Sequence, residues 1–371
     1  MKGMVYIHIP FCHRKCTYCA FYSVATERGR QRYVDALCRE LEMRACTWER
    51  AVRTIYFGGG TPSVLTLGQL GQIVETLRCC YDLSALEECS LEANPEDLTP
   101  EYLSGLRKLD FFNRISIGIQ SFHDDELHLL NRRHSAAQAR QAAVDAHSAG
   151  FENISIDLIY GLPGQSQERW HDNLREVEAL PVQHLSAYAL TVEDGTILAR
   201  QIGQGRVSSP EEETAVSHYK MLTKWAQQQG FEQYEISNFC QPSFRSRHNS
   251  RYWNRTPYLG AGAAAHSFDG EYRRWNVADV EQYCSLLETG HVPHESEQLT
   301  LRDAHNEYLM TSLRTVEGIE KRCVLPPFVH ALEQKIRKFV DSGLLTETVT
   351  HYRPTTDGLL HADGIASDLF E

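Results

Sequence analysis

Short apolar segments rich in β-branched residues alternate with amphipathic segments along the first two thirds of the chain, and this alternation restricts the fold more than any other feature. The amphipathic segments, such as 33–43 and 136–149, repeat their apolar residues with the period of an α-helix. Strands that are separated by helices pair in parallel. The sequence therefore predicts an α/β fold. The expected strands are 5–9, 54–57, 89–93, 114–119, 154–159 and 185–190.

The number of strand–helix units limits how far the sheet can close. Six units are fewer than a closed eightfold barrel needs, so we expect a partial (β/α)6 barrel. From about residue 208 the alternation weakens, and a helix followed by 231–239 predicts a last strand–helix-like addition.

The last part of the chain has a different pattern, with helices expected over 302–313 and 328–342, then a β-like stretch and a short final helix. We interpret it as a small helical, winged-helix-like domain that packs on the barrel rather than one that reads DNA. The predicted domains are 1–298 and 299–371.

Composition excludes several classes of function. The formal net charge is −12 with histidines taken as neutral, which argues against general nucleic-acid binding. The chain contains no run of eighteen apolar residues, so we expect no membrane-spanning helix. The cysteine count, 11, is odd, and no secretory signal is evident, so we expect a cytoplasmic protein with reduced thiols.

The most specific local signal is a group of three cysteines directly after the first expected strand: Cys12, Cys16 and Cys19. Three thiolates on one loop can hold three irons of a [4Fe–4S] cubane and leave the fourth iron without a protein ligand. Such an iron can chelate the methionine moiety of S-adenosylmethionine (SAM). A structural zinc site is the alternative, but it needs a fourth ligand such as His13 or Cys38, and the spacing does not favour either.

Further polar or glycine-rich positions follow the other expected strands. Residues 58–62 (Gly-Gly-Gly-Thr-Pro) follow the second strand, and Glu92, Gln120, Arg132 and Asp157 end or follow later strands. Each has an ordinary explanation, such as a tight turn or a solvated charge. Because active sites in such folds lie at the carboxyl ends of the strands, their convergence on one rim is what makes them candidates.

Four runs together carry a resemblance to a known family: 6–21, 58–62, 118–122 and 156–163 resemble the oxygen-independent coproporphyrinogen III oxidase superfamily of radical SAM proteins. The resemblance implies a radical-SAM barrel and an electron donor such as flavodoxin or ferredoxin. It implies that Tyr6, Gly59 and Glu92 contact cluster-bound SAM. It also implies that SAM or an adjoining second site is lined by Gly60, Thr61, Gln120, Arg132 and Asp157.

Two branches of that superfamily must be distinguished. Coproporphyrinogen dehydrogenases carry a long N-terminal extension and a fourth cysteine two residues after the third, whereas this chain has Phe21 there and Cys12 near its start. Residues 248–253 and 258–267 resemble HemW-type haem chaperones, although Ala20 departs from that branch. The resemblance implies a protein that binds haem and transfers it to acceptor haem proteins. Homodimer formation stays open, as do coproporphyrinogen oxidation and radical-SAM chemistry on another small molecule.

His248 has two possible roles. A neutral imidazole is a good axial ligand for haem iron, and Tyr252 and Trp253 could form a flat apolar wall beside it. Alternatively, His248 is a hydrogen-bonded structural residue. His8, His13 and His266 are weaker ligand candidates.

The cysteine motif generates a direct prediction. Anaerobically reconstituted protein should bind about four irons per chain, and replacing Cys12, Cys16 or Cys19 by Ala should abolish both the cluster and SAM cleavage. Iron and sulfide analysis with optical spectroscopy measures this. A stoichiometric, air-stable zinc ion on these residues would contradict it.

Overall fold

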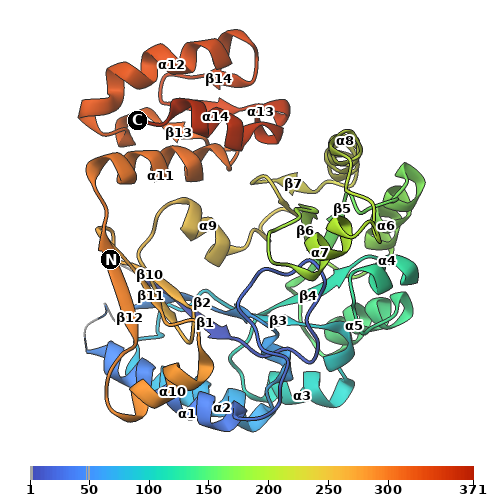
Figure 1. The fold of residues 1–371 in the computed structure, drawn as a ribbon, viewed down its shortest axis with the longest axis vertical. Coiled ribbons are helices and arrows are strands. Elements are labelled where there is room, and N and C mark those ends of the chain that lie inside the picture. The colour runs from blue at the N-terminus through green and yellow to red at the C-terminus, as the bar shows by residue number, and fades with distance from the viewer. Residues whose placement is uncertain (1–2, 47, 49–50) are drawn as a thin grey trace.

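The computed structural model describes residues 3–46, 48 and 51–371, and its centre is a curved sheet of twelve strands in the order β12-β11-β10-β9-β1-β2-β3-β4-β5-β6-β8-β7 (Figure 1). The strands β1 to β6 are consecutive in the sheet and parallel. All six predicted strands are confirmed. Their bounds are β1 Gly3–Ile9, β2 Val52–Gly59, β3 Glu88–Ala93, β4 Arg114–Gln120, β5 Ile154–Tyr160 and β6 His184–Ala189.

Helices cover the outer side of this sheet (Figure 1). The helices α2 and α5 each begin with a capping box, at Thr66 and Ser135, in which side chains satisfy backbone groups of the first turn. Val5, Ile7 and Ile9 of β1 are fully buried beneath the helices. No helix in the described part of the chain is long and apolar enough to span a bilayer. The covering helices are α1 Arg30–Ala45, α2 Leu67–Cys80, α3 Pro100–Lys108, α4 Asp124–Leu129, α5 Ala136–Ser148 and α6 Gln167–Ala179.

The sheet extends beyond the six predicted units on both edges. Next to β6, a helix followed by residues 231–239 was expected to form a last strand–helix-like addition, but β7 (Glu232–Gln233) and β8 (Asn238–Cys240) pair antiparallel. The four residues between them are too few for a parallel crossover. Next to β1, β9 pairs parallel and three antiparallel strands follow. These strands are β9 Tyr258–Ala261, β10 His266–Phe268, β11 Tyr272–Asn276 and β12 His294–Gln298.

Four more helices accompany these additions: α7 Ile197–Gly203, α8 Glu212–Gln228, α9 Arg247–Trp253 and α10 Val280–Glu288. Short 3-10 helices, η1 Pro62–Val64 and η2 Pro95–Asp97, follow β2 and β3. The helix α9 lies on the inner side of the curved sheet (Figure 1). Its first turn is capped by the Glu88 carboxylate of β3, which accepts hydrogen bonds from the Arg247 and His248 amides at 2.8 and 2.9 Å.

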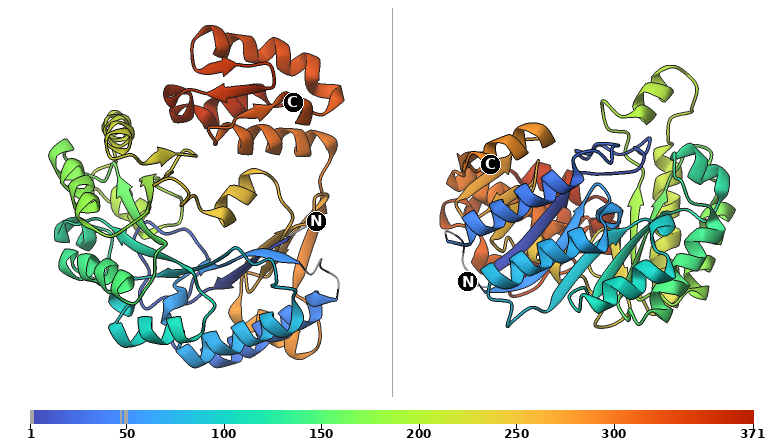
Figure 2. Two further views of the ribbon diagram at one scale, coloured as in Figure 1. Left: turned by 180° about the vertical axis from the view of Figure 1, so that it is seen from behind. Right: turned by 90° about the horizontal axis from the view of Figure 1, so that it is seen from below.

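The C-terminal part forms a separate apolar core at one end of the molecule (Figures 1 and 2). Leu309, Leu313, Ile336, Ile365 and Leu369 are buried in this core. Its helical character agrees with the prediction, and we propose that the domain boundary lies between residues 298 and 299. Its elements are α11 Leu301–Leu313, β13 Ile319–Glu320, η3 Lys321–Cys323, η4 Pro326–Phe328, α12 Val329–Asp341, β14 Leu345–Glu347, β15 His351–Pro354, α13 Thr356–Leu360 and α14 Ala362–Leu369.

Candidate cluster and cofactor site

The loop that carries the three cysteines, residues 10–29, is fastened at its base and in its middle. The Val24 amide donates to the Pro10 carbonyl at 2.7 Å, which closes the base of the loop. In the middle, the Thr17 amide donates to the Leu130 carbonyl at 3.2 Å, and the Thr17 carbonyl accepts from the Leu198 amide of α7 at 2.8 Å. Figure 2 (right) shows this dark blue loop beside α7. The cysteines are therefore held at the carboxyl edge of the parallel strands.

Two of the three thiols contact residues that follow other strands. The Thr61 hydroxyl donates to Cys12 Sγ at 3.4 Å, and Arg132 Nη1 donates to Cys16 Sγ at 3.3 Å. Burial raises the pKa of Cys12 and of Cys19, so these two thiols release protons when they bind a metal.

The arrangement of the ligands bears on the choice between zinc and a cubane. Among the residues that the structure describes, no three His, Cys, Asp or Glu side chains form a group that could hold a single metal ion. A closed zinc site needs such convergence. The three cysteines of a cubane each bind a different iron, so they need not meet at one point. The choice of a cubane over zinc stays a prediction.

Gly59 and Gly60 bring the end of β2 against the backbone of the cysteine loop. The Gly60 amide donates to the Ile9 carbonyl at 2.8 Å, and a Cβ on Gly60 would lie 2.7 Å from the Phe11 carbonyl oxygen. Gly59 has φ 107°, a conformation that favours glycine. The glycines were predicted to let a ligand approach. The structure gives them a packing role, and the contact with a ligand stays a prediction.

Glu92, at the end of β3, is the central carboxylate inside the barrel. It accepts hydrogen bonds from the Tyr56 hydroxyl at 2.7 Å and from the Gly59 amide at 3.3 Å. Burial raises its pKa to about 7; the hydrogen bond from Tyr56 opposes this increase, and the charge of Asp157 adds a smaller one. A carboxyl group that titrates near neutrality inside a barrel is typical of a functional site.

Tyr6 lies beside Glu92, and its contacts connect the barrel interior to the cysteine loop. Its ring stacks on Tyr56, with the ring centroids 6.3 Å apart. The Tyr6 hydroxyl is 3.0 Å from His8 Nδ1, and His8 Nε2 is 3.2 Å from the carbonyl of Tyr22 in the cysteine loop. The burial of His8 lowers its pKa to about 4, so its imidazole is neutral.

Arg132 joins the cysteine loop to two neighbouring strands. Besides Cys16, its guanidinium donates to Asn94 Oδ1 and to the Gly118 carbonyl, both at 2.5 Å. Its Nε atom is buried without a hydrogen-bond partner among the described residues. A buried donor of this kind normally finds a partner, so Arg132 retains capacity for a bound group.

Gln120 and Asp157 lie on the two strands that follow. Gln120 ends β4 with φ 73°, at an irregularity in the pairing with β5, and such backbone conformations in non-glycine residues concentrate at functional sites. Burial raises the pKa of Asp157 to about 6. The predicted rim residues thus lie on the consecutive strands β1 to β5 or in the loops that follow them. Their contacts with SAM stay predictions.

His248 lies apart from the rim, inside the barrel on α9. It is fully buried, and its ring stacks on Tyr56 with centroids 5.1 Å apart. Its Nδ1 is 3.0 Å from the Thr54 hydroxyl and its Nε2 is 3.1 Å from the Tyr252 hydroxyl. In this arrangement neither nitrogen is free to bind iron, so the geometry favours the structural role. The haem-ligand role stays a prediction that requires both hydrogen bonds to break.

Sequence reasoning missed the part played by Tyr56 and the connection from His8 to Tyr22. A signal was present, because Tyr6 and His8 alternate with apolar residues on β1, as Thr54 and Tyr56 do on β2. Alternate residues of a strand point to one face. Polar side chains at such spacing indicate a polar barrel interior.

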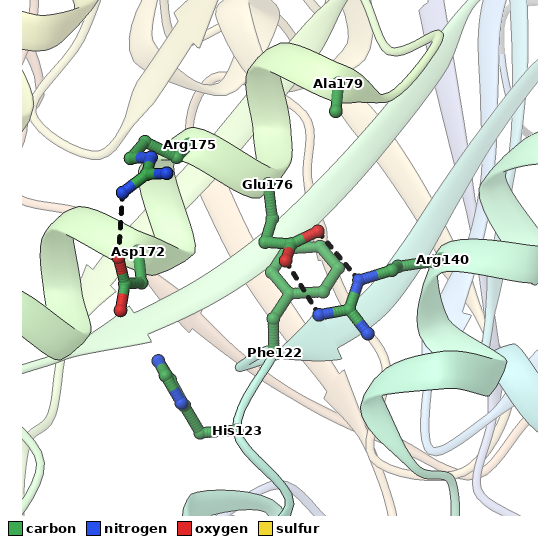
Figure 3. A pocket seen from close by; sticks show the side chains of 7 residues that line it. All are labelled: Phe122, His123, Arg140, Asp172, Arg175, Glu176 and Ala179. Carbon is green, nitrogen blue, oxygen red and sulfur yellow. Dashed lines mark hydrogen bonds and ion pairs between the residues drawn. The ribbon is translucent and has the colours of Figure 1, made fainter.

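The outer side of the barrel has a cavity that contains none of the predicted site residues (Figure 3). It has a volume of about 380 Å³ and lies between α5, α6 and the loop that joins β4 to α4. Its charges are paired, since Arg140 binds Glu176 through two 2.7 Å contacts and Arg175 contacts Asp172 at 3.4 Å. These pairs explain its polar side chains without a ligand.

Comparison with known proteins identifies the same class of protein that the fold and the cysteine loop indicate. The model of the radical SAM superfamily matches residues 6–177. A heme chaperone HemW from Mycobacterium tuberculosis is 37% identical over 374 residues, covering 98% of this chain and 94% of the relative. The Bacillus subtilis heme chaperone HemW is 33% identical, covering 96% of each chain. The chain therefore belongs to the HemW family of radical SAM proteins.

A solved structure supports the fold independently. The coproporphyrinogen III oxidase HemN from Escherichia coli, described as a radical SAM enzyme, matches with a TM-score of 0.85. The match covers 100% of this chain and 90% of that chain at 24% sequence identity. At this identity the likeness establishes the radical SAM fold and not the reaction.

The pKa of Glu92 generates a prediction on SAM binding. An ionised carboxylate accepts stronger hydrogen bonds than a neutral one. SAM should therefore bind more tightly as the pH rises from about 6 to about 8, through the Glu92 pKa of about 7. Equilibrium binding of SAM to reconstituted, unreduced protein measures this without turnover. Glu92→Gln should bind weakly and lose most of the pH dependence, whereas Asp157→Asn should keep the pH dependence with a midpoint at lower pH, because the Asp157 charge raises the Glu92 pKa. A flat profile in the unsubstituted protein would rule out this role of Glu92.

Proposed function

We propose that this protein is a haem chaperone, which binds haem and passes it to acceptor haem proteins, and that a [4Fe–4S] cluster and SAM at the barrel rim control this transfer. The main support is the likeness to heme chaperones HemW over nearly the full length of both chains. The rim geometry is compatible with the cluster and SAM that a radical SAM protein uses.

The residues at the rim have distinct parts in this proposal. Cys12, Cys16 and Cys19 hold the cluster, which when bound supplies the electron that cleaves SAM. Glu92 accepts hydrogen bonds from SAM, and its negative charge attracts the positive sulfonium. Arg132, already bonded to Cys16, holds the loop in register with β3 and β4.

The proposal includes partners and a compartment. A reduced flavodoxin or ferredoxin supplies the electron, and haem proteins are the acceptors. The protein acts in the cytoplasm, where thiols such as the partly exposed Cys12, Cys16 and Cys19 stay reduced. A homodimer is an additional hypothesis that sedimentation tests.

Coproporphyrinogen oxidation is the alternative function, and one observation weighs against it. The position two residues after Cys19 holds Phe21, whose side chain is 70% exposed and cannot bind metal. The E. coli oxidase resembles this chain at 24% identity, so that likeness does not extend to the reaction.

Haem transfer is the experiment that tests the proposed function. Reconstituted protein, titrated anaerobically with haemin, should develop a Soret band that saturates at a fixed stoichiometry. When haem-loaded protein is mixed with an excess of an apo haem protein, the acceptor spectrum should appear faster in the presence of SAM and reductant. Absence of saturable haem binding in the unsubstituted protein would refute the proposal.

Another prediction concerns the alternative reaction. Incubation with coproporphyrinogen III, SAM and a reductant should yield no protoporphyrinogen IX, because the residue two positions after Cys19 is phenylalanine. Chromatography of the oxidised porphyrins measures this, with SAM cleavage to 5′-deoxyadenosine as the control for an active cluster. Stoichiometric decarboxylation would show that the oxidase assignment is right.

A further inference from the structure

The cysteine loop, residues 10–29, is a basic segment in an acidic protein. It contains Arg14, Lys15 and Arg28 but only one carboxylate, Glu27, whereas the formal net charge of the chain is −12. All three cationic residues are exposed. Because a protein of this net charge repels an acidic partner over much of its surface, a local positive patch determines where such a partner can approach.

The single carboxylate of the loop does not neutralise these three cations. Glu27 Oε1 lies 3.6 Å from His13 Nδ1 and 4.0 Å from Arg30 Nη2. Arg14 donates a hydrogen bond of 3.5 Å to the side-chain oxygen of Asn131, which carries no charge. Within the part of the chain that the structure describes, none of the three exposed cations forms an ion pair. Their positive charge is therefore available to a partner.

Two of the cations lie on the segment that carries the cysteines. Arg14 and Lys15 occupy positions between Cys12 and Cys16. The Asn131 side chain fixes this turn, because it donates to the Lys15 carbonyl at 2.8 Å and accepts from Arg14. Electron transfer between two proteins requires that their redox centres come close together. A partner that binds these two side chains lies directly over the loop that would hold the cluster.

The surroundings of the loop differ in charge on its two sides. On the side of α4 and α5, Arg133 is exposed, and its nearest carboxylate, Glu96, at 3.7 Å, also contacts His134 at 3.2 Å. On the side of α7, two exposed carboxylates, Glu193 and Asp194, precede the helix. The positive surface therefore covers the cysteine loop and continues toward Arg133, and it ends toward α7.

An exposed aromatic residue of the same loop favours a protein as the partner. The Phe21 side chain is 70% exposed. Aromatic residues and arginine are enriched in protein–protein interfaces relative to the rest of the surface, and they supply most of the residues that dominate binding energy.

We propose that the surface formed by Arg14, Lys15, Arg28 and Phe21 is the docking site of an acidic, one-electron donor protein. The assignment rests on the proposed function, in which a reduced flavodoxin or ferredoxin supplies the electron, and it names the surface that receives this donor. In the docked complex the donor loses one electron and the cluster on the cysteine loop gains it, and no bond between the two proteins forms.

Equilibrium binding of oxidised flavodoxin to full-length protein tests the surface without turnover. At low ionic strength, the variant Arg14→Glu/Lys15→Glu should bind flavodoxin about tenfold more weakly, or worse, than the unsubstituted protein. The difference should nearly vanish at about 1 M salt, where the Debye length is about 3 Å. Lys108→Glu/Lys224→Glu makes the same charge change at exposed positions of α3 and α8. This matched control should bind nearly as the unsubstituted protein does.

SAM cleavage separates docking from the chemistry of the cofactor. With flavodoxin as the donor, Arg14→Glu/Lys15→Glu should need more flavodoxin for half-maximal formation of 5′-deoxyadenosine. When the cluster has first been fully reduced with dithionite, the same variant should cleave SAM as fast as the unsubstituted protein. Iron content, measured beforehand, shows that the loop holds its cluster. Should the double variant lose iron, Arg28→Glu, which lies outside the segment from Cys12 to Cys19, tests the same weakening of flavodoxin binding.

The outcomes distinguish the docking surface from the proposed function. Flavodoxin affinity at low ionic strength that is equal in Arg14→Glu/Lys15→Glu, Arg28→Glu and the unsubstituted protein would overturn the docking surface and leave the haem chaperone function standing. A loss of affinity in the Lys108→Glu/Lys224→Glu control as large as that in the loop variant would also overturn it, because net charge alone would then explain the effect. Absence of haem binding by the unsubstituted protein would instead remove the proposed function.

Discussion

The close contact between the backbone of Gly60 and that of Ile9 and Phe11 sets the geometry of the whole rim. Only a residue without a Cβ can occupy this position, because a Cβ would lie within 3 Å of both carbonyl oxygens. Gly59, one residue earlier, donates to Glu92, and Thr61, one residue later, donates to Cys12. A single contact between two strand ends therefore determines where a cysteine and a carboxylate lie relative to each other.

The barrel interior contains more buried acid than the structure neutralises. Burial raises the pKa of both Glu92 and Asp157, to about 7 and about 6, although Arg132 lowers that of Asp157. Buried carboxylates without full compensation favour a cationic ligand, because a positive charge stabilises their ionised form. The sulfonium group of SAM would supply such charge, so the electrostatics of the rim agree with the proposed cofactor.

The parts of the fold that depend on local pattern could be predicted from the sequence. Six buried parallel strands read as short apolar runs, and the rule that their carboxyl ends meet at one edge brought Glu92, Gln120, Arg132 and Asp157 to the cysteine loop. The edge strands β9 to β12 could not be predicted, because long-range polar contacts hold them. Asn276 of β11 donates to the fully buried Glu40 of α1 at 2.8 Å and accepts from Arg44 at 3.0 Å. No pattern of neighbouring residues in the sequence predicts such a hydrogen-bond network.

The environment of His248 was beyond sequence reasoning for the same reason. Its burial follows from the capping of α9 by Glu88, a residue 160 positions earlier in the chain. The pattern of residues 248–253 indicated a haem ligand, and the structure instead surrounds the imidazole with Thr54, Tyr56 and Tyr252. The sequence placed His266 among the weaker candidates, and the structure leaves it exposed beside Trp275.

The central claim is that Cys12, Cys16 and Cys19 hold a cubane whose fourth iron is open to SAM. Electron paramagnetic resonance of the reduced, reconstituted protein at cryogenic temperature tests it most directly. SAM should change the g-values and line shape of the reduced cluster, because its amino and carboxylate groups would bind the open iron. In the Glu92→Gln variant the same change should require a higher SAM concentration. A spectrum that saturating SAM leaves unaltered in the unsubstituted protein would contradict the claim.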